Sequence, residues 1–361
     1  MTKSAGVVTR IECPCRADLA GGTLDIWPLG MLHPGSVTVN AAIPVLVRMD
    51  VDLGAPEGEV WHAMGNGGWT RLDASDATTD LSAAVAFAVR PRGGVRVRVH
   101  SQASLGSGLG GSSAYAVALA RGILTALDEK MEDERLVLMA RDLEARILTV
   151  PTGLQDHWPA VQGGVLAIHH EPGGERVERL RIDPKWVSER LTVFDTGITH
   201  HSGMVNWQVI RRRLDRDSET TEALEAIAEA ARSCRTELVA GNEGGVGKAI
   251  GAEWNARKHL APEVCPPDLE KIIEAGRAVG ASAIKACGAG GGGSVLVWHP
   301  PAARRAISTA LATAAPEGRV VATDVSMAVS YTHLTLPTMQ CMCCSRWWRG
   351  GWGGGGGGGG G

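Results

Sequence analysis

The sequence predicts an α+β fold of two domains. The chain has 361 residues, which at the usual size of about 150 residues per domain is enough for two. Segments typical of strands and segments with helical spacing occur in both halves. A turn-rich stretch, EPGGER, interrupts them in the middle of the chain. We therefore expect a first domain over 1–186 and a second over 187–329.

The first half and the boundary region alternate between strand and helix signals. The strand segments alternate apolar and polar residues or are rich in β-branched residues. The helix segments are rich in Ala and Leu, or carry apolar residues at helical spacing with charges between them. The expected strands are 37–52, 95–100, 163–170 and 190–197, and the expected helices are 112–126 and 132–148.

The second half continues with helices before it returns to strands. Its helical segments again have apolar residues at a helical period, and a glycine-rich turn lies between the last of them and a short apolar run. The expected helices are 220–240 and 267–278, the turn is 287–293, and the expected strands are 294–298 and 319–325.

The last residues differ in composition from the body. Residues 330–361 contain the segments CMCC and RWWRGGW and then an unbroken glycine run. Glycine tracts bury no apolar side chains and lose much entropy on ordering. We expect 330–361 to be a non-native or disordered tail, with a genuine flexible tail as the alternative.

Composition excludes several classes of partner. The formal net charge is −3, and aromatic residues make up 4% of the chain, so neither a basic nor a base-stacking surface for nucleic acid is expected. No apolar run approaches the roughly 20 residues of a membrane span, and no signal peptide is visible. The eight cysteines are scattered or crowd the end of the chain, which is typical of reduced thiols. We expect a cytoplasmic protein.

The most informative segment is a glycine-rich turn between a strand and a helix. SLGSGLGGSSA follows VRVRVHS and precedes YAVALARGIL. Such a turn directs backbone N–H groups and the positive end of the helix dipole to one point, which suits a phosphate. Ser112 and Ser113 follow, where hydroxyls can bind a phosphate or Mg²⁺. The alternative is a serine N-cap after a flexible turn.

Two other nucleotide motifs fit less well. Gly106, Gly108 and Gly111 satisfy the dinucleotide fingerprint of NAD-dependent dehydrogenases, but Asp128 and Glu129 end a predicted helix, where the fingerprint requires an acidic residue after a second strand. The segment GGVGKA approaches a Walker A loop, but Ala249 stands where that loop has Ser or Thr.

Three motifs together give a more specific signal. CRADLAGGTLD near the start, SLGSGLGGSSA, and ACGAGGGGSVLV near the end resemble, in that order, the signature motifs of the GHMP kinases. With Glu144, PTGLQD and FDTGITHHSG, the chain looks most like the sugar-kinase branch, which includes heptose 7-phosphate kinase, fucokinase and galactokinase. The resemblance covers the chain from about Ile11 to Val325.

This resemblance implies a fold and an activity. The fold would have an N-terminal ribosomal-protein-S5-domain-2-like domain and a C-terminal ferredoxin-like domain. The activity would be phosphorylation of a sugar or sugar-phosphate hydroxyl, by analogy the anomeric one, with ATP and Mg²⁺, in a monomer or homodimer. A non-catalytic sensor of sugar or nucleotide and an NAD-dependent dehydrogenase remain the alternatives.

The resemblance also implies roles for residues at the nucleotide. The glycine turn would wrap the phosphates, Ser112 would bind a phosphate, and Ser113 with Glu144 would bind Mg²⁺. A solvent-exposed carboxylate is the alternative for Glu144. The third motif would shape the site from the second domain. The residues expected to bind the nucleotide are Gly106, Gly108, Leu109, Gly110, Gly111, Ser112, Ser113, Gly290 and Gly291.

The catalytic pair implied by the resemblance is Asp156 and Arg16. Asp156 would orient the acceptor hydroxyl and take its proton. Arg16 would stabilise charge on the transferred phosphoryl group or keep Asp156 ionised. A helix cap before His157 is the alternative for Asp156.

The acceptor is the least determined part of the resemblance. The first motif reads AGGTLD where heptose-type kinases have AGGGTD, which places the identity of the sugar in doubt. A neutral and a phosphorylated hexose or heptose are equally compatible, and Trp27 or Trp158 would offer a ring on which a sugar could stack. The residues expected at the substrate are Gly21, Gly22, Asp25, Thr196 and Gly197.

Overall fold

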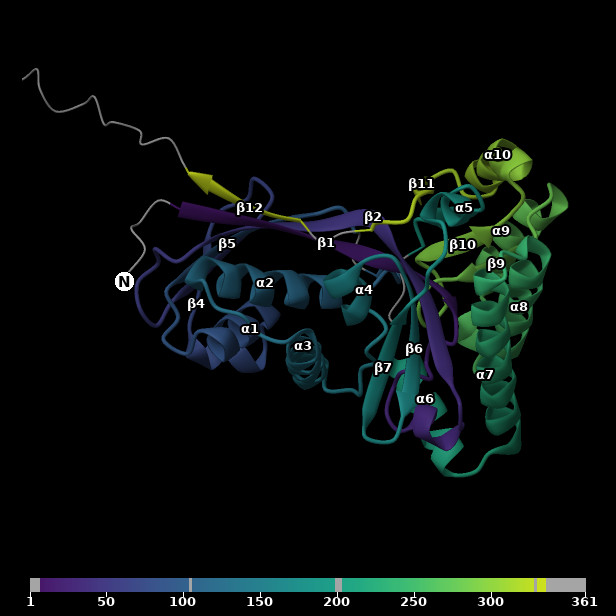
Figure 1. Cartoon of the computed structure of the whole chain (residues 1–361), viewed down its shortest axis with the longest axis horizontal. Coiled ribbons are helices and arrows are strands. Elements are labelled where there is room, and N and C mark those ends of the chain that lie inside the picture. Colours follow the sequence, from purple (N-terminus) through teal and green to yellow (C-terminus); the bar gives the residue numbers. More distant parts are fainter. Residues whose placement is uncertain (1–6, 104–105, 199–202, 328–329, 336–361) are drawn as a thin grey trace, which may run out of the picture.

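The computed structural model describes residues 7–103, 106–198, 203–327 and 330–335. Over these ranges the chain forms two separate β-sheets, each packed against helices (Figure 1). The α+β prediction is confirmed. Five cysteines among the described residues are free thiols, and no helix in this part of the chain is long and apolar enough to cross a membrane.

The first sheet has eight strands and is antiparallel except where β3 pairs with β5. Its order is β12-β1-β2-β5-β3-β4, and β6 pairs with β2 and β7 with β6. The long strand β2 reaches both β5 and β6 because its two ends pair with different neighbours. The strands are β1 (Val7–Ala20), β2 (Val37–Asp52), β3 (Val60–Met64), β4 (Thr70–Leu72), β5 (Val95–Ser101), β6 (Val165–Glu171), β7 (Gly174–Arg179) and β12 (Ser330–Thr335).

Four helices accompany the first sheet: α1 (Leu81–Val89), α2 (Gly111–Leu127), α3 (Asp133–Leu148) and α4 (His157–Gln162). Figure 1 shows α2 lying along β1 and β2, with α1 and α3 farther from the sheet. The small residues of α2 allow this close approach. A Cβ on Gly122 would lie 2.7 Å from the Val51 side chain on β2, well inside normal contact distance.

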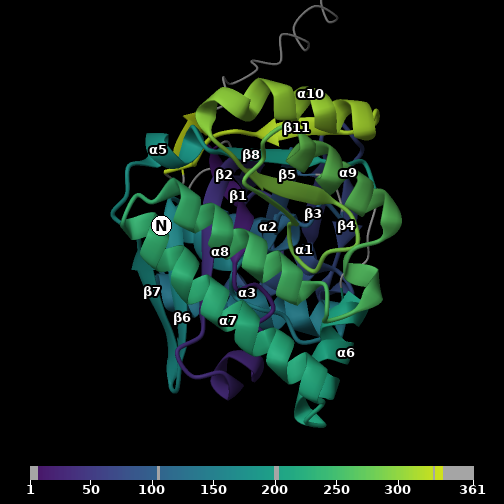
Figure 2. The ribbon, with the colours of Figure 1, turned by 90° about the vertical axis from the view of Figure 1, so that its right-hand side faces the viewer.

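The second sheet has the order β11-β8-β10-β9 and is antiparallel. Its strands are β8 (Leu191–Asp195), β9 (Ala283–Ala286), β10 (Ser294–Trp298) and β11 (Arg319–Ala322). The helices of this half are α5 (Pro184–Ser188), α6 (Gly203–Leu214), α7 (Ser218–Val239), α8 (Glu243–Arg257), α9 (Pro267–Ala278) and α10 (Arg304–Ala314). Figure 2 shows α7 and α8 side by side. Short 3₁₀ helices occupy Leu29–Leu32, Ala74–Thr78, Pro262–Val264 and Pro301–Ala303.

Several expected elements coincide with the structure, and others were missed. Strand β2 and helix α9 have the expected bounds. Strand β1, which carries the first motif, was not expected as a strand. The six residues of β12 pair with β1, so the ordered sheet extends past the boundary expected at 329. The rest of the expected tail, 336–361, lies outside the described residues.

The architecture also decides between the rival nucleotide motifs. The segment GGVGKA lies inside α8, where Asn242 caps the helix by accepting a hydrogen bond from the Gly245 N–H, so it is not a phosphate loop. The glycine turn does precede a helix, α2, but α2 is followed by another helix, α3. A dinucleotide-binding fold needs a parallel sheet and a strand after that helix. The dehydrogenase alternative was therefore wrong.

Candidate active site

A cavity of about 580 Å³ lies where the sequence motifs converge. Its wall includes β1 with the turn that follows it, residues of β3 and β5, the start of α1, the glycine turn with the start of α2, α3 with the loop to α4, the loop that starts at Cys287, and Asn206 of α6. These segments come from both halves of the chain. The motifs that the sequence spreads over more than 270 positions therefore share one site.

The glycine turn forms one wall of this cavity. Helix α2 begins at Gly111, and Gly110 before it has φ +73°, a left-handed conformation that favours glycine. A Cβ at Gly110 would also lie 3.0 Å from Asp156. The turn is fixed from two sides, because the Arg16 N–H donates to the Leu109 carbonyl (3.0 Å) and the Ser294 N–H donates to that of Ser107 (2.8 Å). Hydrogen bonds from both halves of the chain thus anchor the predicted cradle.

The third motif packs directly on the glycine turn. A Cβ at Gly108 would lie 2.5 Å from the Cys287 carbonyl oxygen, so only glycine allows the two loops to touch. Gly290 lines the cavity, as expected, together with Gly288 and Gly292. Gly291 is not part of the described wall. Its N–H donates to the Val264 carbonyl (2.7 Å), which anchors the loop from behind.

Arg16 and Asp156 form an ion pair at the cavity. Arg16 is almost fully buried on β1, and its Nε and Nη2 lie 2.7 and 2.6 Å from the same oxygen, Oδ1, of Asp156. Its Nη1 donates to the Gly108 carbonyl. Burial alone would lower the pKa of Arg16, but Asp156 and Asp18 raise it above its ordinary value. Arg16 is therefore a permanent cation in the wall of the cavity.

Asp156 remains partly open to solvent, with 27% of its side chain exposed. It occupies the N-cap position of α4, but its side chain makes no capping hydrogen bond to the helix. The helix-cap alternative for Asp156 therefore does not hold. Since Arg16 contacts Oδ1, the second oxygen, Oδ2, is not engaged in this pair.

Glu144 and Ser113 meet next to the glycine turn. Ser113 Oγ on α2 donates to Glu144 Oε2 on α3 at 2.7 Å, and both residues are buried. The alternative of a solvent-exposed Glu144 was therefore wrong. Burial alone would raise the pKa of Glu144, but hydrogen bonds from His157, Ser112 and Ser113 and the charge of His157 lower it. A buried, ionised carboxylate beside a hydroxyl is a donor set that suits a hard cation such as Mg²⁺.

Asp25 lines the same cavity as Arg16 and Asp156. It is buried in the cavity wall, and its Oδ2 accepts a hydrogen bond from the Gln155 N–H (3.0 Å). Gly153 leaves room for it, because a Cβ there would lie 1.7 Å from Oδ2. Burial and the neighbouring Asp156 raise the pKa of Asp25 to about 6, against the opposing Gln155 hydrogen bond.

Four of the residues expected at the substrate lie outside the described wall. Gly21 and Gly22 begin the turn that carries Asp25 but do not line the cavity. Thr196 does not line the cavity, and its Oγ1 donates a hydrogen bond to the Gly293 carbonyl (2.6 Å). Gly197 does not line it either and lies next to Glu317.

The expected aromatic platform is also absent from the described wall. Trp158 is buried in the core, and Trp27 is 74% exposed but does not line the cavity. His200, in the segment FDTGITHHSG, lies outside the described residues.

The structure adds residues that sequence reasoning missed. His157 is fully buried, and its Nε2 lies 3.2 Å from Glu144 Oε2. At another part of the wall, Ser82 Oγ lies 2.6 Å from the Tyr115 hydroxyl and 3.3 Å from His62 Nδ1. His157 directly follows Asp156, so its position was a usable signal. The Ser82 group depends on packing between α1, α2 and β3, which no local pattern reveals.

Comparison with known proteins agrees with this geometry. The model for the GHMP kinases N terminal domain matches residues 78–164, and the model for the GHMP kinases C terminal matches residues 221–317. Together these matches cover half of the chain and contain the glycine turn, Glu144 and Asp156.

Individual relatives are more distant. A bifunctional fucokinase/GDP-fucose pyrophosphorylase of Arabidopsis thaliana is 24% identical over 316 residues, which is 80% of this chain but 30% of that protein. A D-glycero-alpha-D-manno-heptose 7-phosphate kinase of Campylobacter jejuni is 23% identical, with 81% of this chain and 89% of the relative covered. A mevalonate kinase of Pyrococcus abyssi is 28% identical, with 61% and 64% covered.

The fold is shared with solved structures. The structure of Lactococcus lactis galactokinase complexed with galactose superposes with a TM-score of 0.73 at 13% identity, covering 90% of this chain and 95% of that one. The two sheets, the three motifs that meet at the cavity and the two family models all point to the same family. The chain has the two-domain α+β GHMP kinase fold and belongs to the GHMP kinases, a family of ATP-dependent small-molecule kinases that transfer phosphate to an alcohol.

Proposed function

We propose that this protein phosphorylates a hydroxyl group of a sugar, with MgATP as the donor. The observation that carries the proposal is the position of Asp156. Its carboxylate is held by Arg16, adjoins the glycine turn at Gly110, and shares one cavity with the buried carboxylate of Asp25. A phosphate cradle, a base and an acceptor for hydroxyl hydrogen bonds thus adjoin one another.

The nucleotide end supports binding of MgATP. The start of α2, from Gly111 to Ser113, lines the cavity, so the positive end of its dipole faces a negatively charged ligand. Ser113 and Glu144 are the residues that would hold Mg²⁺. When bound, Mg²⁺ neutralises charge on the phosphate oxygens during transfer. His157 and Ser113 keep the Glu144 carboxylate oriented and ionised for this role.

The catalytic pair supports proton transfer from an alcohol. Oδ2 of Asp156 is the oxygen left to orient the acceptor hydroxyl and to take its proton as the new O–P bond forms. Arg16 fixes Oδ1 and stays charged, so Asp156 is held in one orientation. The Arg16 guanidinium also stabilises negative charge on the group in transfer.

The charge of the cavity supports an uncharged acceptor. Among the described residues of the wall, Arg16 is the one lysine or arginine, and Asp156 already pairs with it. Asp25, Asp80, Glu144 and Asp156 supply negative charge. A mevalonate carboxylate or a sugar phosphate would need a further cationic partner there. A neutral polyol needs only hydrogen-bond partners, which Asp25 provides.

The test is ADP release by the full chain with MgATP and a panel of acceptors. The panel contains galactose, fucose, mannose, a heptose 7-phosphate and mevalonate. We expect one neutral sugar to stimulate turnover and Asp156→Asn to abolish it while ATP still binds. Stimulation by mevalonate alone would replace the sugar assignment. Nucleotide binding without turnover on any acceptor would favour the non-catalytic sensor.

A further inference from the structure

The turn that follows β1 has an unusual backbone. It runs from Gly21 to Asp25 and carries Thr23 at φ +77°. This left-handed conformation is unfavourable for a β-branched residue and persists only where the surroundings hold it. The turn matters because Thr23 and Asp25 both line the cavity. Something else in the molecule must therefore fix this turn.

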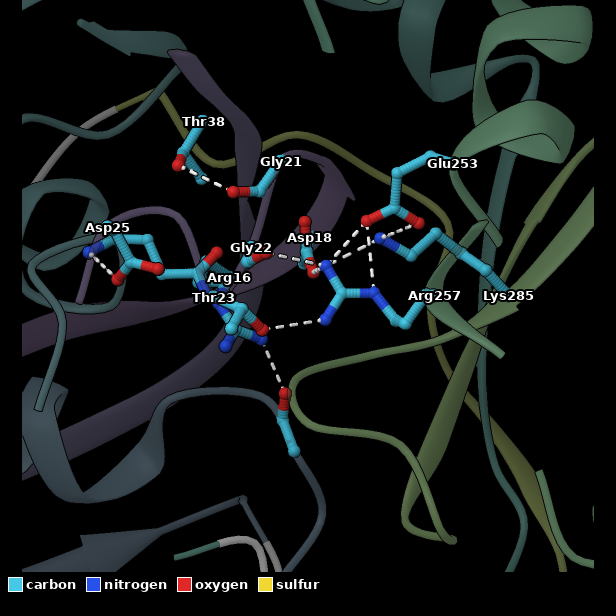
Figure 3. Close-up of polar contacts among 12 residues, drawn as sticks. Arg16, Asp18, Gly21, Gly22, Thr23, Asp25, Thr38, Glu253, Arg257 and Lys285 are labelled. Carbon is cyan, nitrogen blue, oxygen red and sulfur yellow. Dashed lines mark hydrogen bonds and ion pairs between the residues drawn. The ribbon is translucent and has the colours of Figure 1, made fainter. Parts of the chain in front are cut away.

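Arg257 holds the turn from the second half of the chain. It ends α8, is 1% exposed, and donates from Nη1 to Thr23 Oγ1 (3.0 Å) and from Nη2 to the Gly22 carbonyl (2.8 Å). On the opposite side, Thr38 Oγ1 of β2 donates to the Gly21 carbonyl (3.0 Å). Figure 3 shows the turn between these two supports.

Arg257 belongs to a buried cluster of charged residues that holds it in place. We call this group, which consists of Asp18, Glu253, Arg257 and Lys285, the sealed cluster. All four are at most 1% exposed. Arg257 donates two hydrogen bonds to Glu253 Oε1, and Lys285 Nζ lies 3.1 Å from Asp18 Oδ2 and 3.0 Å from Glu253 Oε2. Two carboxylates and two cations balance, so the cluster is neutral as a whole (Figure 3).

The sealed cluster connects the strand that carries Arg16 with the strand that leads to the Cys287 loop. Asp18 lies on β1, two residues beyond Arg16. Lys285 lies on β9, two residues before Cys287, which contacts the glycine turn. Through Arg257, the cluster also reaches Thr23. None of its four members lines the cavity, so they act on ligands only through the residues they hold.

We propose that Arg257, oriented by the sealed cluster, is a positioning residue that fixes the Gly21–Asp25 turn and so sets the affinity for the acceptor. What the turn binds rests on the proposed function, but the immobilisation of the turn by Arg257 does not. Arg257 contacts the turn at the Thr23 hydroxyl, so this residue with a left-handed backbone has a hydrogen-bond partner that holds it.

The first test measures the turn directly by hydrogen–deuterium exchange of its backbone amides. Leu24 N–H donates to the Gly21 carbonyl and Ile26 N–H to that of Thr23, so both amides report on the turn. Thr23→Val removes the hydroxyl and keeps the shape, whereas Thr23→Ser keeps the hydroxyl. We expect exchange of these amides to be about tenfold faster in Thr23→Val and Arg257→Lys, and unchanged in Thr23→Ser.

The second test separates acceptor affinity from turnover and nucleotide binding. For Arg257→Lys and Thr23→Val we expect the KM of the acceptor to rise about tenfold, with kcat and the Kd of ATP changed less than about threefold. The double variant should be no worse than Arg257→Lys alone, because the Arg257–Thr23 contact that Thr23→Val removes is also removed by Arg257→Lys. Arg190→Lys is the matched control, since Arg190 binds Glu243 and the Trp186 carbonyl away from the cavity.

The outcomes are distinguishable. Unchanged amide exchange in Thr23→Val would overturn the proposal, as would a parallel loss of ATP and acceptor affinity in both variants. If Arg257→Lys does not fold, the Thr23→Val and Thr23→Ser pair decides. If the wild-type protein turns over no acceptor, the proposed function fails, while the exchange data still decide the role of Arg257.

Discussion

Strand β1 sends two charged residues into two different ion networks. Arg16 pairs with Asp156, whose side chain is 27% exposed toward the cavity. Asp18, two residues later, belongs to the sealed cluster, in which all members are at most 1% exposed. The contacts are of the same chemical kind and similar length, yet their surroundings differ.

The difference shows how one kind of contact serves two purposes. In the sealed cluster each charge has a buried partner of opposite sign and no member lines the cavity, so the loss of one partner would be costly. We call Arg16 and Asp156 the open pair, because Oδ2 of Asp156 is not contacted by Arg16. Under the proposed function, this oxygen is the one that meets the acceptor, whereas the sealed cluster holds Arg257 against the turn.

The open pair should dominate the chemistry. We expect Asp156→Asn to lower kcat about 10³-fold, because the amide cannot take the proton of the acceptor hydroxyl. ATP affinity should stay within about threefold, since the glycine turn is unchanged. The measurement is steady-state ADP release with nucleotide binding by calorimetry.

Asp183→Asn is the matched control for this substitution. Asp183 is exposed and caps α5 by accepting a hydrogen bond from the Lys185 N–H, which Asn can also do. If both variants lost activity equally, the assignment of Asp156 would be wrong.

The sealed cluster should dominate stability. We expect Lys285→Met to lower the free energy of unfolding by about 3 kcal/mol, because Asp18 and Glu253 lose a buried counter-charge. Urea denaturation measures this effect. Arg10→Met is the surface comparison: Arg10 pairs with Asp50 at 2.7 Å but is 42% exposed, so its loss should cost about 1 kcal/mol or less. If both substitutions lowered the free energy of unfolding equally, burial would not distinguish the sealed cluster from a surface ion pair.

Glu144 is intermediate, since it is buried but faces the cavity. We expect Glu144→Gln to raise the Mg²⁺ concentration for half-maximal turnover about tenfold, because an amide is a weaker ligand than a carboxylate. A Mg²⁺ titration of ADP release measures this. Glu134→Gln, on an exposed part of the same helix, should leave the titration unchanged. An unaltered titration in Glu144→Gln would remove Glu144 from the metal site.

Asp25 should give the smallest effect, a dependence on pH. Its pKa is raised to about 6 from an ordinary value of 3.8, so its contribution to stability is complete below pH 3.8 and is lost as the pH rises through about 6. Acceptor affinity should follow the opposite course, because the carboxylate accepts hydroxyl hydrogen bonds best when ionised. We expect kcat/KM for the acceptor to fall severalfold between pH 7 and pH 5.5.

The variant Asp25→Asn tests that assignment. It should flatten both the acceptor profile and the matching change in thermal stability between pH 5 and pH 7. A pH step that persists in Asp25→Asn would assign the titration to another group.

The sequence predicted what depends on local patterns. The period of β2 and the proline-led start of α9 are visible in a few residues, and their bounds matched the structure. The glycine turn and its helix were likewise expected. The order of three short motifs was enough to bring Arg16, Glu144 and Asp156 together in one hypothesis.

What the sequence did not predict depends on contacts between distant segments. Helix α8 was missed because its apolar residues lie all around it and its glycines suggest a loop. Glu253, Arg257 and Lys285 then look like ordinary surface charges, and nothing local shows that they meet Asp18. The same reason hid the burial of Glu144, which depends on how α3 packs against α2 and α4.

The sealed cluster also bears on the order in which the protein is made. Asp18 leaves the ribosome early, whereas Lys285 and Arg257, which neutralise it, are among the later parts to appear. Until then the first sheet must expose this carboxylate to water or protonate it. The buried charge cluster around Asp18 can therefore form only after the chain has been made as far as Lys285.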